Sequence, residues 1–304
     1  MNILAITTFN RSHFLKKLID SFVASITSKW LIIIADDGST DGTLEYLKEL
    51  KIPDIPIMVI NNDRQGVHHQ FNTIVRELEK IDFDYCFKCD DDIEFIKPGW
   101  EELYINAIEK SGYHHLCHFD SSWRPEKSLN PPKKEGPLIS HCKGEDVQGA
   151  FFTLTPEVIK KVGYMDVENF GFRGVGHIDY TLRACRAGFN DFEHPFDVQR
   201  SNEYILHQKD DYKSALNIHV QNALEDDTET KRKYELIKDK TRLYVGFNEN
   251  KDVLNKPLER ILLLKRLDAL EKEKQWYEIT YGHQPRWFIR LGKALNYIHN
   301  LFKN

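Results

Sequence analysis

Strand and helix patterns alternate along the first 90 residues, and this alternation limits the folds that the chain can adopt. Residues 30–35 form a continuous apolar run, which is typical of a parallel strand covered on both faces. The expected strands are residues 3–8, 30–35, 57–60 and 84–89, and the expected helices between them are residues 12–25, 41–50 and 68–80. Strands that alternate with helices predict an open, mostly parallel α/β sheet.

Polar side chains follow three of these strands at the point where each strand ends. They are Thr8, Asn10 and Arg11 after the first strand, Asp37 after the second, and Asp90, Asp91 and Asp92 after the fourth. In an open parallel sheet, ligands bind outside the carboxyl ends of the strands. We therefore expect these three polar clusters to converge on one edge of the sheet and to form a site there.

The run of three aspartates at the end of the fourth strand predicts a specific ligand. Adjacent carboxylates repel one another and are costly to bury unless a cation compensates them. Mg²⁺ or Mn²⁺ takes oxygen ligands, and such an ion commonly binds through one or two carboxylates and the phosphates of a substrate. The alternative is a solvated acidic turn.

Composition excludes several other classes of protein. A net charge of -5 gives no basic field, so a nucleic-acid partner is not expected. No apolar run approaches the ~18 residues of a membrane span, and the N-terminus lacks a secretory signal pattern, so we expect a cytoplasmic protein. The five cysteines are scattered, and the pair Cys86 and Cys89 is interpreted as buried strand thiols rather than a zinc or redox site.

The second half of the chain is less regular. Residues 121–143 are expected to form a long loop, residues 147–154 a strand, residues 156–162 a short helix and residues 178–187 a helix. Residues 284–304 form a basic amphipathic helix pattern with aromatic residues at one end. This pattern suits peripheral contact with an anionic membrane. Packing on the α/β part of the chain, or a homodimer through residues 253–304, remains the alternative.

Several motifs together resemble those of family 2 glycosyltransferases with the GT-A fold. They are ITTFNR at residues 6–11, ADDGSTDGT at 35–43, the segment 61–72 around Gly66, CDDDI at 89–93, GAFF at 149–152, VGYMD at 162–166 and GHIDYTLR at 176–183. The resemblance covers about residues 1–210. It implies a Rossmann-like catalytic core over residues 1–210, with a nucleotide-sugar half at 1–95 and an acceptor half at 96–210. Residues 211–250 would then connect and close the active site, and residues 251–304 would form a helical extension.

The resemblance also implies an activity. Such an enzyme transfers a hexosyl-type sugar, with inversion and with Mn²⁺ or Mg²⁺, from a nucleotide-diphosphate sugar to a glycan or lipid-linked acceptor. A UDP-sugar is the expected donor. The C-terminal pattern would suit an enzyme of polysaccharide biosynthesis for the cell envelope, placed at the inner face of the membrane.

Residue roles follow from the same resemblance. Asp37 matches the carboxylate that accepts a hydrogen bond from the nucleobase, and an acceptor-only group suits a base N–H. Asp92 matches the aspartate that holds the metal, and His207 is the candidate for a further metal ligand. The other implied donor-binding residues are Thr8, Asn10, Arg11, Arg64, Asp90 and Asp91.

The chain departs from the family pattern at the catalytic base. His177 stands where the family has an aspartate, and Gly176 stands where it has a glutamate. A neutral imidazole can act as a general base near pH 7. Asp179, two residues further on, could instead orient His177 or act as the base itself, so both remain candidates.

Two other functions compete with glycosyl transfer. A sugar-phosphate nucleotidyltransferase also combines an α/β nucleotide fold with acidic metal ligands, but residues 7–13 lack the glycine-rich pyrophosphate loop expected of it. A catalytically degenerate glycan-binding or scaffold protein is the other alternative, and the histidine at position 177 motivates it.

Overall fold

The computed structural model describes residues 1–120, 122, 133–171, 174–208 and 227–248, and all of them belong to one compact unit. The expectations for residues 211–226 and 251–304 lie outside the described residues. These include the amphipathic pattern at 284–304 and the dimer through 253–304. Within the part that the structure describes, no helix is long and apolar enough to cross a membrane.

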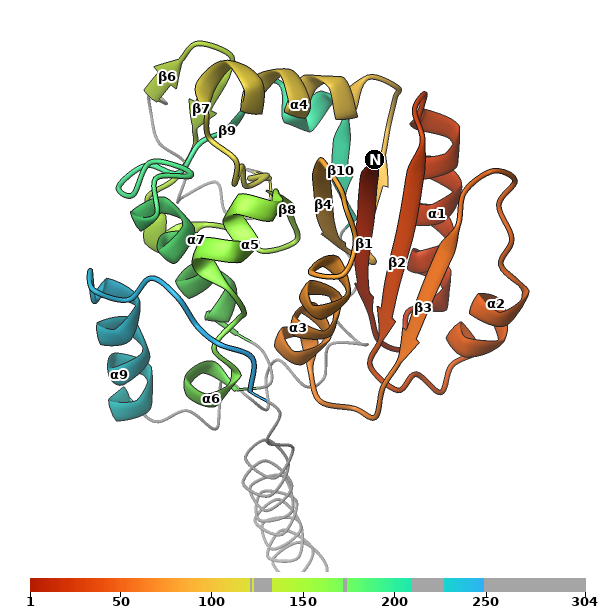
Figure 1. The fold of residues 1–304 in the computed structure, drawn as a ribbon, viewed down its shortest axis with the longest axis horizontal. Helices are drawn as coiled ribbons and strands as arrows, with labels where there is room; N and C mark the ends of the chain where they lie inside the picture. The colour runs from red at the N-terminus through yellow and green to blue at the C-terminus, as the bar shows by residue number, and fades with distance from the viewer. Residues whose placement is uncertain (121, 123–132, 172–173, 209–226, 249–304) are drawn as a thin grey trace, which may run out of the picture. The chain divides into compact units, whose positions relative to one another are not determined.

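A five-stranded sheet forms the centre of this unit (Figure 1). Its order is β3 (Ile57–Asn61), β2 (Trp30–Asp36), β1 (Asn2–Thr8), β4 (Tyr85–Asp90) and β8 (Phe151–Leu154). The first four strands are parallel, and β8 runs antiparallel to β4. The expected open and mostly parallel α/β sheet is therefore confirmed.

The strand register brings the polar clusters to one level. Thr8 of β1 lies opposite Asp36 of β2, and Thr7 lies opposite Asp90 of β4. The neighbouring strands β2, β1 and β4 therefore end at the same level, so the residues that follow them meet at one edge of the sheet.

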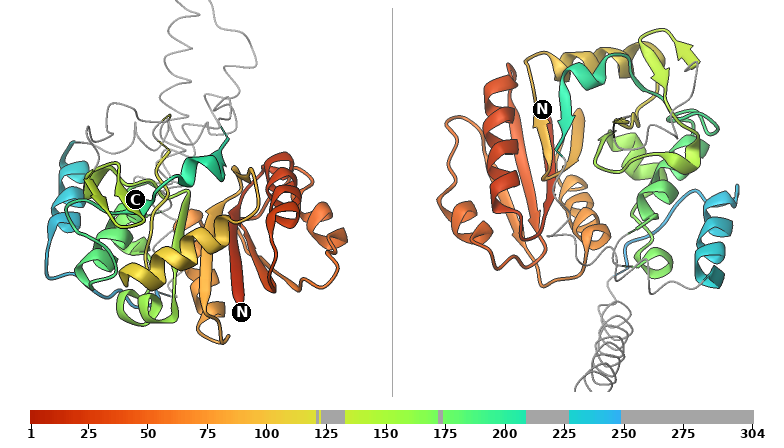
Figure 2. Two further views of the ribbon diagram at one scale, coloured as in Figure 1. Left: turned by 90° about the horizontal axis from the view of Figure 1, so that it is seen from above. Right: turned by 180° about the vertical axis from the view of Figure 1, so that it is seen from behind.

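Helices cover both faces of the sheet (Figures 1 and 2). Side chains alternate between the faces of a strand, and in β1 Leu4 and Ile6 pack in one cluster while Ile3 and Ala5 pack in another. The first cluster contains the buried face of α1 (Ser12–Ser25), and the second contains that of α3 (Val67–Leu78). A third helix, α2 (Thr43–Glu49), packs beside α1.

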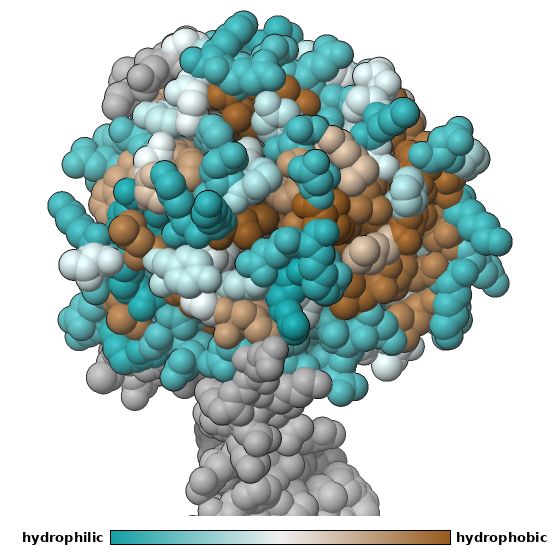
Figure 3. All heavy atoms as spheres, viewed as in Figure 1, coloured by the Kyte–Doolittle hydropathy of each residue, from teal (hydrophilic) through white to brown (hydrophobic). Residues whose placement is uncertain are grey.

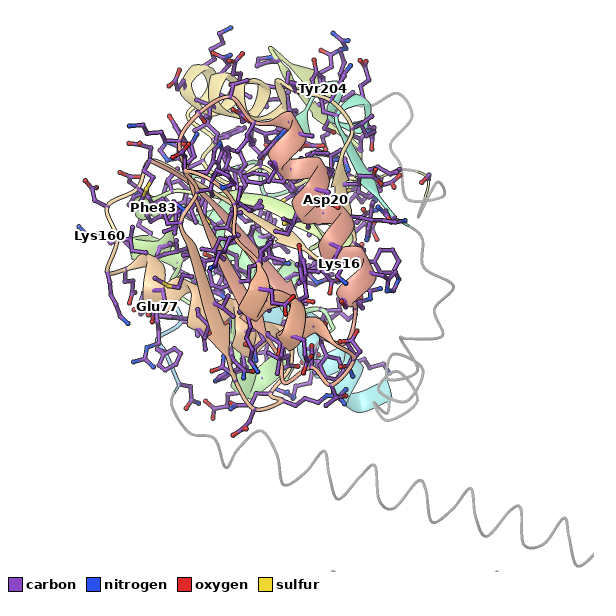
Figure 4. The ribbon with its side chains drawn as sticks, turned by 90° about the vertical axis from the view of Figure 1, so that its right-hand side faces the viewer. Lys16, Asp20, Glu77, Phe83, Lys160 and Tyr204 are labelled. Carbon is purple, nitrogen blue, oxygen red and sulfur yellow. The ribbon has the colours of Figure 1, made fainter. Side chains whose placement is uncertain are left out.

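The outer face of α1 is polar, as its helical spacing predicts. Lys16 and Asp20 are exposed one turn apart on this face, where Figure 4 labels them, while Leu15 and Leu18 are fully buried. At the edge of the sheet, β3 remains more open, and its Val59 is 40% exposed. Figure 3 shows hydrophobic side chains gathered on the side of the unit where this edge strand lies.

An aromatic cluster fixes the chain just after the acidic turn. The turn at Asp91 and Asp92 leads from β4 into β5 (Ile93–Phe95). Phe95 stacks on Trp100, the first residue of α4 (Trp100–Ser111), with ring centroids 4.2 Å apart. Trp100 in turn contacts Phe87 of β4 edge to face at 5.0 Å. The acidic turn is thus held by packed aromatic residues on both sides.

The second half of the described chain adds small elements around this core. The helices are α5 (Pro156–Val162), α6 (Val167–Phe170), α7 (Gly176–Arg186) and α9 (Asp227–Lys238), with 3-10 turns at Gly144–Asp146 and Ser201–Glu203. The strands β6 (Lys133–Glu135), β7 (Leu138–Ser140) and β9 (Asp197–Val198) form a small sheet, and β10 (Ile205–His207) pairs with β5.

Three expectations for this half need correction. The expected loop at 121–143 contains the hairpin of β6 and β7, because pairing with β9 supplies the partner that a local pattern cannot show. The expected strand at 147–154 is paired only from Phe151 to Leu154. The helix expected at 178–187 begins earlier, at Gly176, and ends at Arg186.

All five cysteines of the chain are buried and free. Cys86 and Cys89 lie in β4 with no exposed surface, as expected for structural thiols. Burial raises the pKa of all five thiols, and it raises the pKa of Cys117 to about 12.

Candidate active site

The end of β1 contacts the acidic turn directly. The Thr8 hydroxyl donates a hydrogen bond of 2.8 Å to Asp91 Oδ2, and the Thr7 hydroxyl donates one of 3.0 Å to Asp90 Oδ1. Asp91 and Asp92 are only 3% and 6% exposed. The predicted convergence of the first and fourth strand ends is therefore present, and it buries two carboxylates.

Two protein cations compensate this cluster of acids. Arg11 Nη1 lies 2.9 Å from Asp91 Oδ1 and 2.8 Å from Asp92 Oδ2. Lys88 of β4 bonds to Asp90 and donates to the Gly149 carbonyl at 3.0 Å. Part of the compensation that the sequence assigned to a divalent cation is thus supplied by the chain itself.

The two buried aspartates differ in how readily they hold a proton. Burial raises the pKa of Asp91 to about 7, against the opposing charge of Arg11. Burial acts in the same direction on Asp92, but the hydrogen bond and charge of His207, together with Arg11, outweigh it and lower the pKa. Asp92 is therefore the carboxylate that stays ionised and suited to a metal ion.

The position of His207 fits a metal site shared with Asp92. The antiparallel pairing of β10 with β5 places His207 opposite Ile93, and its Nε2 lies 3.3 Å from Asp92 Oδ1. Two neighbouring ligand atoms of an octahedral ion, each at about 2.1 Å, lie about 3 Å apart. No group of three His, Cys, Asp or Glu side chains among the described residues is placed to hold a metal. Asp92 and His207 would therefore supply two ligands and leave positions for phosphate oxygens and water.

Asp37 organises the loop that precedes α3. Its carboxylate accepts hydrogen bonds from the Gln65 N–H at 2.6 Å, the Gly66 N–H at 3.0 Å and Gln70 Nε2 at 2.7 Å. Burial raises its pKa even though these hydrogen bonds favour the charged form. Asp37 is 4% exposed, and its own N–H donates to the Thr8 carbonyl at 3.0 Å. Its predicted role in base recognition stays a prediction.

Asn10 bonds to the loop after β2, and Arg64 lies in the loop before α3. Asn10 adopts a left-handed conformation (φ 51°), which asparagine tolerates. It donates from its backbone to Ser39 Oγ at 2.8 Å and accepts from the Thr40 N–H at 2.7 Å. The Arg64 guanidinium lies 4.1 Å from the centroid of the Phe9 ring. Burial lowers the pKa of Arg64.

His177 is held by two backbone carbonyls. Its Nδ1 lies 2.9 Å from the Gly174 oxygen, and its Nε2 lies 3.1 Å from the Val147 oxygen. Burial lowers the pKa of the ring, which favours the neutral form. Both ring nitrogens face carbonyl oxygens, so in this arrangement the lone pair of the neutral ring is not directed at an acceptor hydroxyl. A β-carbon at Gly149 would lie 2.6 Å from the ring.

Asp179 belongs to a buried ionic network. Arg183 Nε donates to its carboxylate at 2.8 Å, and both side chains have no exposed surface. Arg242 Nη2 lies 3.4 Å from Asp179 and 2.7 Å from Asp166. Arg183 also donates to the Val162 carbonyl at 2.6 Å. This network fixes α7 against the segment after α5, and direct contact of Asp179 with an acceptor would require it to open.

The structure joins most of the predicted site residues but not all of them. One cluster of contacting side chains contains Thr8, Arg11, Asp91, Asp92 and His207. Next to it, Lys88 connects Asp90 with Gly149, which adjoins the His177 ring. The adjoining loops contain Asn10, Asp37 and Arg64. Sequence reasoning missed Lys88, Gln65, Gln70 and Phe9. A lysine inside an apolar strand was the one signal that could have revealed Lys88.

The family model for glycosyl transferase family 2 matches residues 3–161, just over half of the chain. The chain belongs to this family. The matched region contains β1 to β8 and the whole acidic turn, whereas His177, Asp179 and His207 lie beyond it.

Known proteins similar to this glycosyltransferase share little sequence with it. The uncharacterized glycosyltransferase R363 of Acanthamoeba polyphaga mimivirus is 23% identical over 208 residues, which are 66% of this chain and 79% of that protein. The mannosyltransferase PcManGT from Pyrobaculum calidifontis, solved with GDP-Man and Mn²⁺, is 12% identical with a TM-score of 0.51; the match covers 97% of this chain and 84% of PcManGT. S. aureus TarS gives 12% identity and a TM-score of 0.48, and the match covers 78% of this chain but only 42% of TarS. The fold is that of the GT-A glycosyltransferases.

Proposed function

We propose that this glycosyltransferase transfers a hexosyl residue, with inversion, from a nucleotide-diphosphate sugar to a hydroxyl group of a glycan or lipid-linked acceptor. A UDP-sugar is our first candidate for the donor. The observation that carries the proposal is the pairing of Asp92 and His207 at 3.3 Å at the carboxyl end of the sheet. PcManGT, which was solved with GDP-Man and Mn²⁺, supports a divalent metal in this fold.

Asp92 and His207 would hold Mn²⁺ or Mg²⁺, which when bound supplies Lewis-acid stabilisation of the leaving diphosphate. Thr8 and Arg11 both bond to Asp91 and keep it in place, and the loops at Asn10 and Asp37 line the proposed nucleotide site. The bond from the anomeric carbon to the diphosphate oxygen breaks as the acceptor oxygen attacks the opposite face. The hydroxyl proton passes to the base, for which His177 and Asp179 are the candidates.

The C-terminal part of the proposal rests on the sequence pattern alone. Peripheral membrane contact through residues 284–304, or a homodimer through residues 253–304, would suit an enzyme of cell-envelope polysaccharide biosynthesis. Vesicle co-sedimentation of the full chain with and without anionic lipid would separate the two arrangements.

The first prediction tests the metal and the donor together. The full chain, screened against UDP- and GDP-sugars with Mn²⁺, should release nucleoside diphosphate, and excess EDTA should stop the release. Asp92→Asn keeps the side-chain size but removes the ligand charge, so it should lower turnover by at least ~10²-fold, because a metal contributes several kcal/mol to such a step.

Asp82→Asn, at an exposed aspartate before β4, is the matched control and should keep wild-type turnover. Full activity of Asp92→Asn, or full activity in EDTA, would refute the metal assignment. Tight donor binding without any turnover would instead favour a glycan-binding protein.

A further inference from the structure

Arg11 and the proposed metal ion require the same carboxylate. One guanidinium nitrogen, Nη1, lies 2.9 Å from Asp91 and 2.8 Å from Asp92 Oδ2, while the other oxygen of Asp92 lies 3.3 Å from His207. Asp92 therefore holds Arg11 through Oδ2 and faces His207 with Oδ1. A divalent ion on this carboxylate would sit close to the guanidinium, and two cations at such a distance repel each other.

The backbone of Arg11 is fixed by hydrogen bonds, whereas its side chain is partly exposed to solvent. Its carbonyl accepts from the N–H groups of Phe14 and Leu15, which anchors the residue at the start of α1. Its side chain is 22% exposed, in contrast to 3% and 8% for the side chains of Asp91 and Asp92. The guanidinium can thus turn towards solvent without any change in the helix.

Asp91 can keep hold of Arg11 while the guanidinium turns away from Asp92. Its Oδ2 is held by the Thr8 hydroxyl at 2.8 Å, and its Oδ1 faces Arg11. Loss of the contact with Asp92 would leave Arg11 attached to Asp91 and release guanidinium N–H groups. A guanidinium carries five donors that suit phosphate oxygens.

We propose that Arg11 is an exchangeable counter-ion, which holds Asp91 and Asp92 together in the ligand-free enzyme and gives up Asp92 when the divalent cation binds. The released guanidinium donors then face the diphosphate of the donor while Asp91 retains the arginine. This inference rests on the proposed function, because it takes Asp92 as the metal ligand. It makes Arg11 a donor-binding residue that couples metal binding to donor binding.

The test measures Mn²⁺ binding alone, without donor, by electron paramagnetic resonance of the free ion. Arg11→Gln removes the competitor, so it should bind Mn²⁺ roughly tenfold more tightly than the wild type, as expected for loss of one charged hydrogen bond. Lys88→Gln removes an equal charge next to the acidic turn, but Lys88 contacts Asp90 and not Asp92. It should change the affinity much less. Asp92→Asn should abolish Mn²⁺ binding both in the wild type and in the Arg11→Gln variant.

The outcomes separate the inference from the function on which it rests. If Asp92→Asn abolishes binding but Arg11→Gln binds Mn²⁺ no more tightly than the wild type, the exchange is wrong and the metal site stands. If the wild type does not bind Mn²⁺, or if Asp92→Asn binds it equally well, the metal site itself is wrong and the exchange falls with it.

A second measurement uses the wild-type protein and does not depend on the folding of a variant. In a titration with diamagnetic Mg²⁺, the side-chain N–H signals of Arg11, assigned with Arg11→Lys, should exchange faster with water as the ion binds. Unchanged exchange at saturating Mg²⁺ would overturn the proposal.

Discussion

Asp37 combines a structural task with its predicted role in nucleotide recognition. Asp37→Ala would leave the N–H groups of Gln65 and Gly66 without their acceptor, so we expect a loss of about 1–3 kcal/mol in the free energy of unfolding. It should also weaken UDP binding about tenfold, because a base N–H would lose its partner. Urea unfolding and calorimetry with UDP alone measure the two effects.

Gln70→Met serves as the control for this prediction. It removes one donor to Asp37 but keeps the carboxylate, so it should lower stability without a comparable loss of affinity. Unchanged UDP affinity in Asp37→Ala would rule out the assignment to the nucleobase.

The base can be identified from pH profiles of turnover. If His177 is the base, one ring nitrogen must leave its carbonyl partner, and the rate should rise with pH through a pKa below the usual ~6.5, because burial lowers that pKa. His177→Ala should then lower turnover by about 10²–10⁴-fold and leave donor binding nearly intact.

The competing candidate makes a different prediction in the same assay. If Asp179 is the base, Asp179→Asn should show that loss, with the rise in rate shifted to lower pH. Since Asp179 also pairs with fully buried Arg183, the variant should be less stable by about 3–5 kcal/mol whichever residue is the base. Wild-type turnover in both single variants would show that the start of α7 does not supply the base.

Much of the cluster around the acidic turn could be foreseen residue by residue, because polar groups at the ends of parallel strands must converge. Thr8, Arg11 and Asp92 meet for this reason, although the sequence does not show that Arg11 would bind two aspartates. The contacts of Asp179 could not be foreseen in the same way. The partners of Asp179 include Arg242, more than 60 residues away in the chain, and such contacts leave no local pattern.

At the scale of elements, the start of α7 packs against the start of α3. A β-carbon at Gly176 would lie 2.5 Å from the His68 ring, which is itself 2% exposed. Gly176→Ala should therefore lower the free energy of unfolding by about 1–3 kcal/mol through overpacking. Gly246→Ala is the control, since its β-carbon would meet only Tyr244 at 4.0 Å. Equal stability of the two variants in urea unfolding would contradict this packing.

The elements themselves were predictable where the pattern is long. The α1 helix has the expected bounds, and the four parallel strands differ from expectation by a residue or so, because their periodicity extends over several residues. β10 has only three residues and exists through its pairing with β5. A strand of this length carries no periodic signal, and so the element that delivers His207 had to be seen in the structure.

At the scale of the whole unit, two buried neutral histidines make its stability depend on pH. Burial lowers the pKa of His68 and of His115 to about 4, whereas an unfolded chain titrates near ~6.5. The unfolded state therefore takes up protons first as the pH falls. The contribution of these histidines to the free energy of unfolding is complete above about pH 6.5. It is lost progressively towards pH 4, by about 2 kcal/mol per histidine at pH 5.

Asp91 acts in the opposite sense, because its pKa is raised to about 7 and protonation therefore favours the folded state. The test consequently compares the wild type with His115→Asn by urea unfolding at pH 7.5 and pH 5. The wild type should lose about 2 kcal/mol more than the variant over this interval. The His115 ring lies 2.9 Å from the Thr153 carbonyl and 3.0 Å from the Thr181 hydroxyl. Equal losses would show that it is not held neutral between them.

Because all five cysteines are buried, we expect the native thiols of the folded enzyme to react little with labelling reagents. The thiolate is the form of cysteine that attacks an alkylating reagent, and buried thiols with raised pKa values form almost no thiolate. A single cysteine introduced at an exposed position such as Lys48 would thus be the only fast-reacting thiol of the folded unit. A fluorophore could be attached there without removal of any native cysteine, and the native thiols would react only as the protein unfolds.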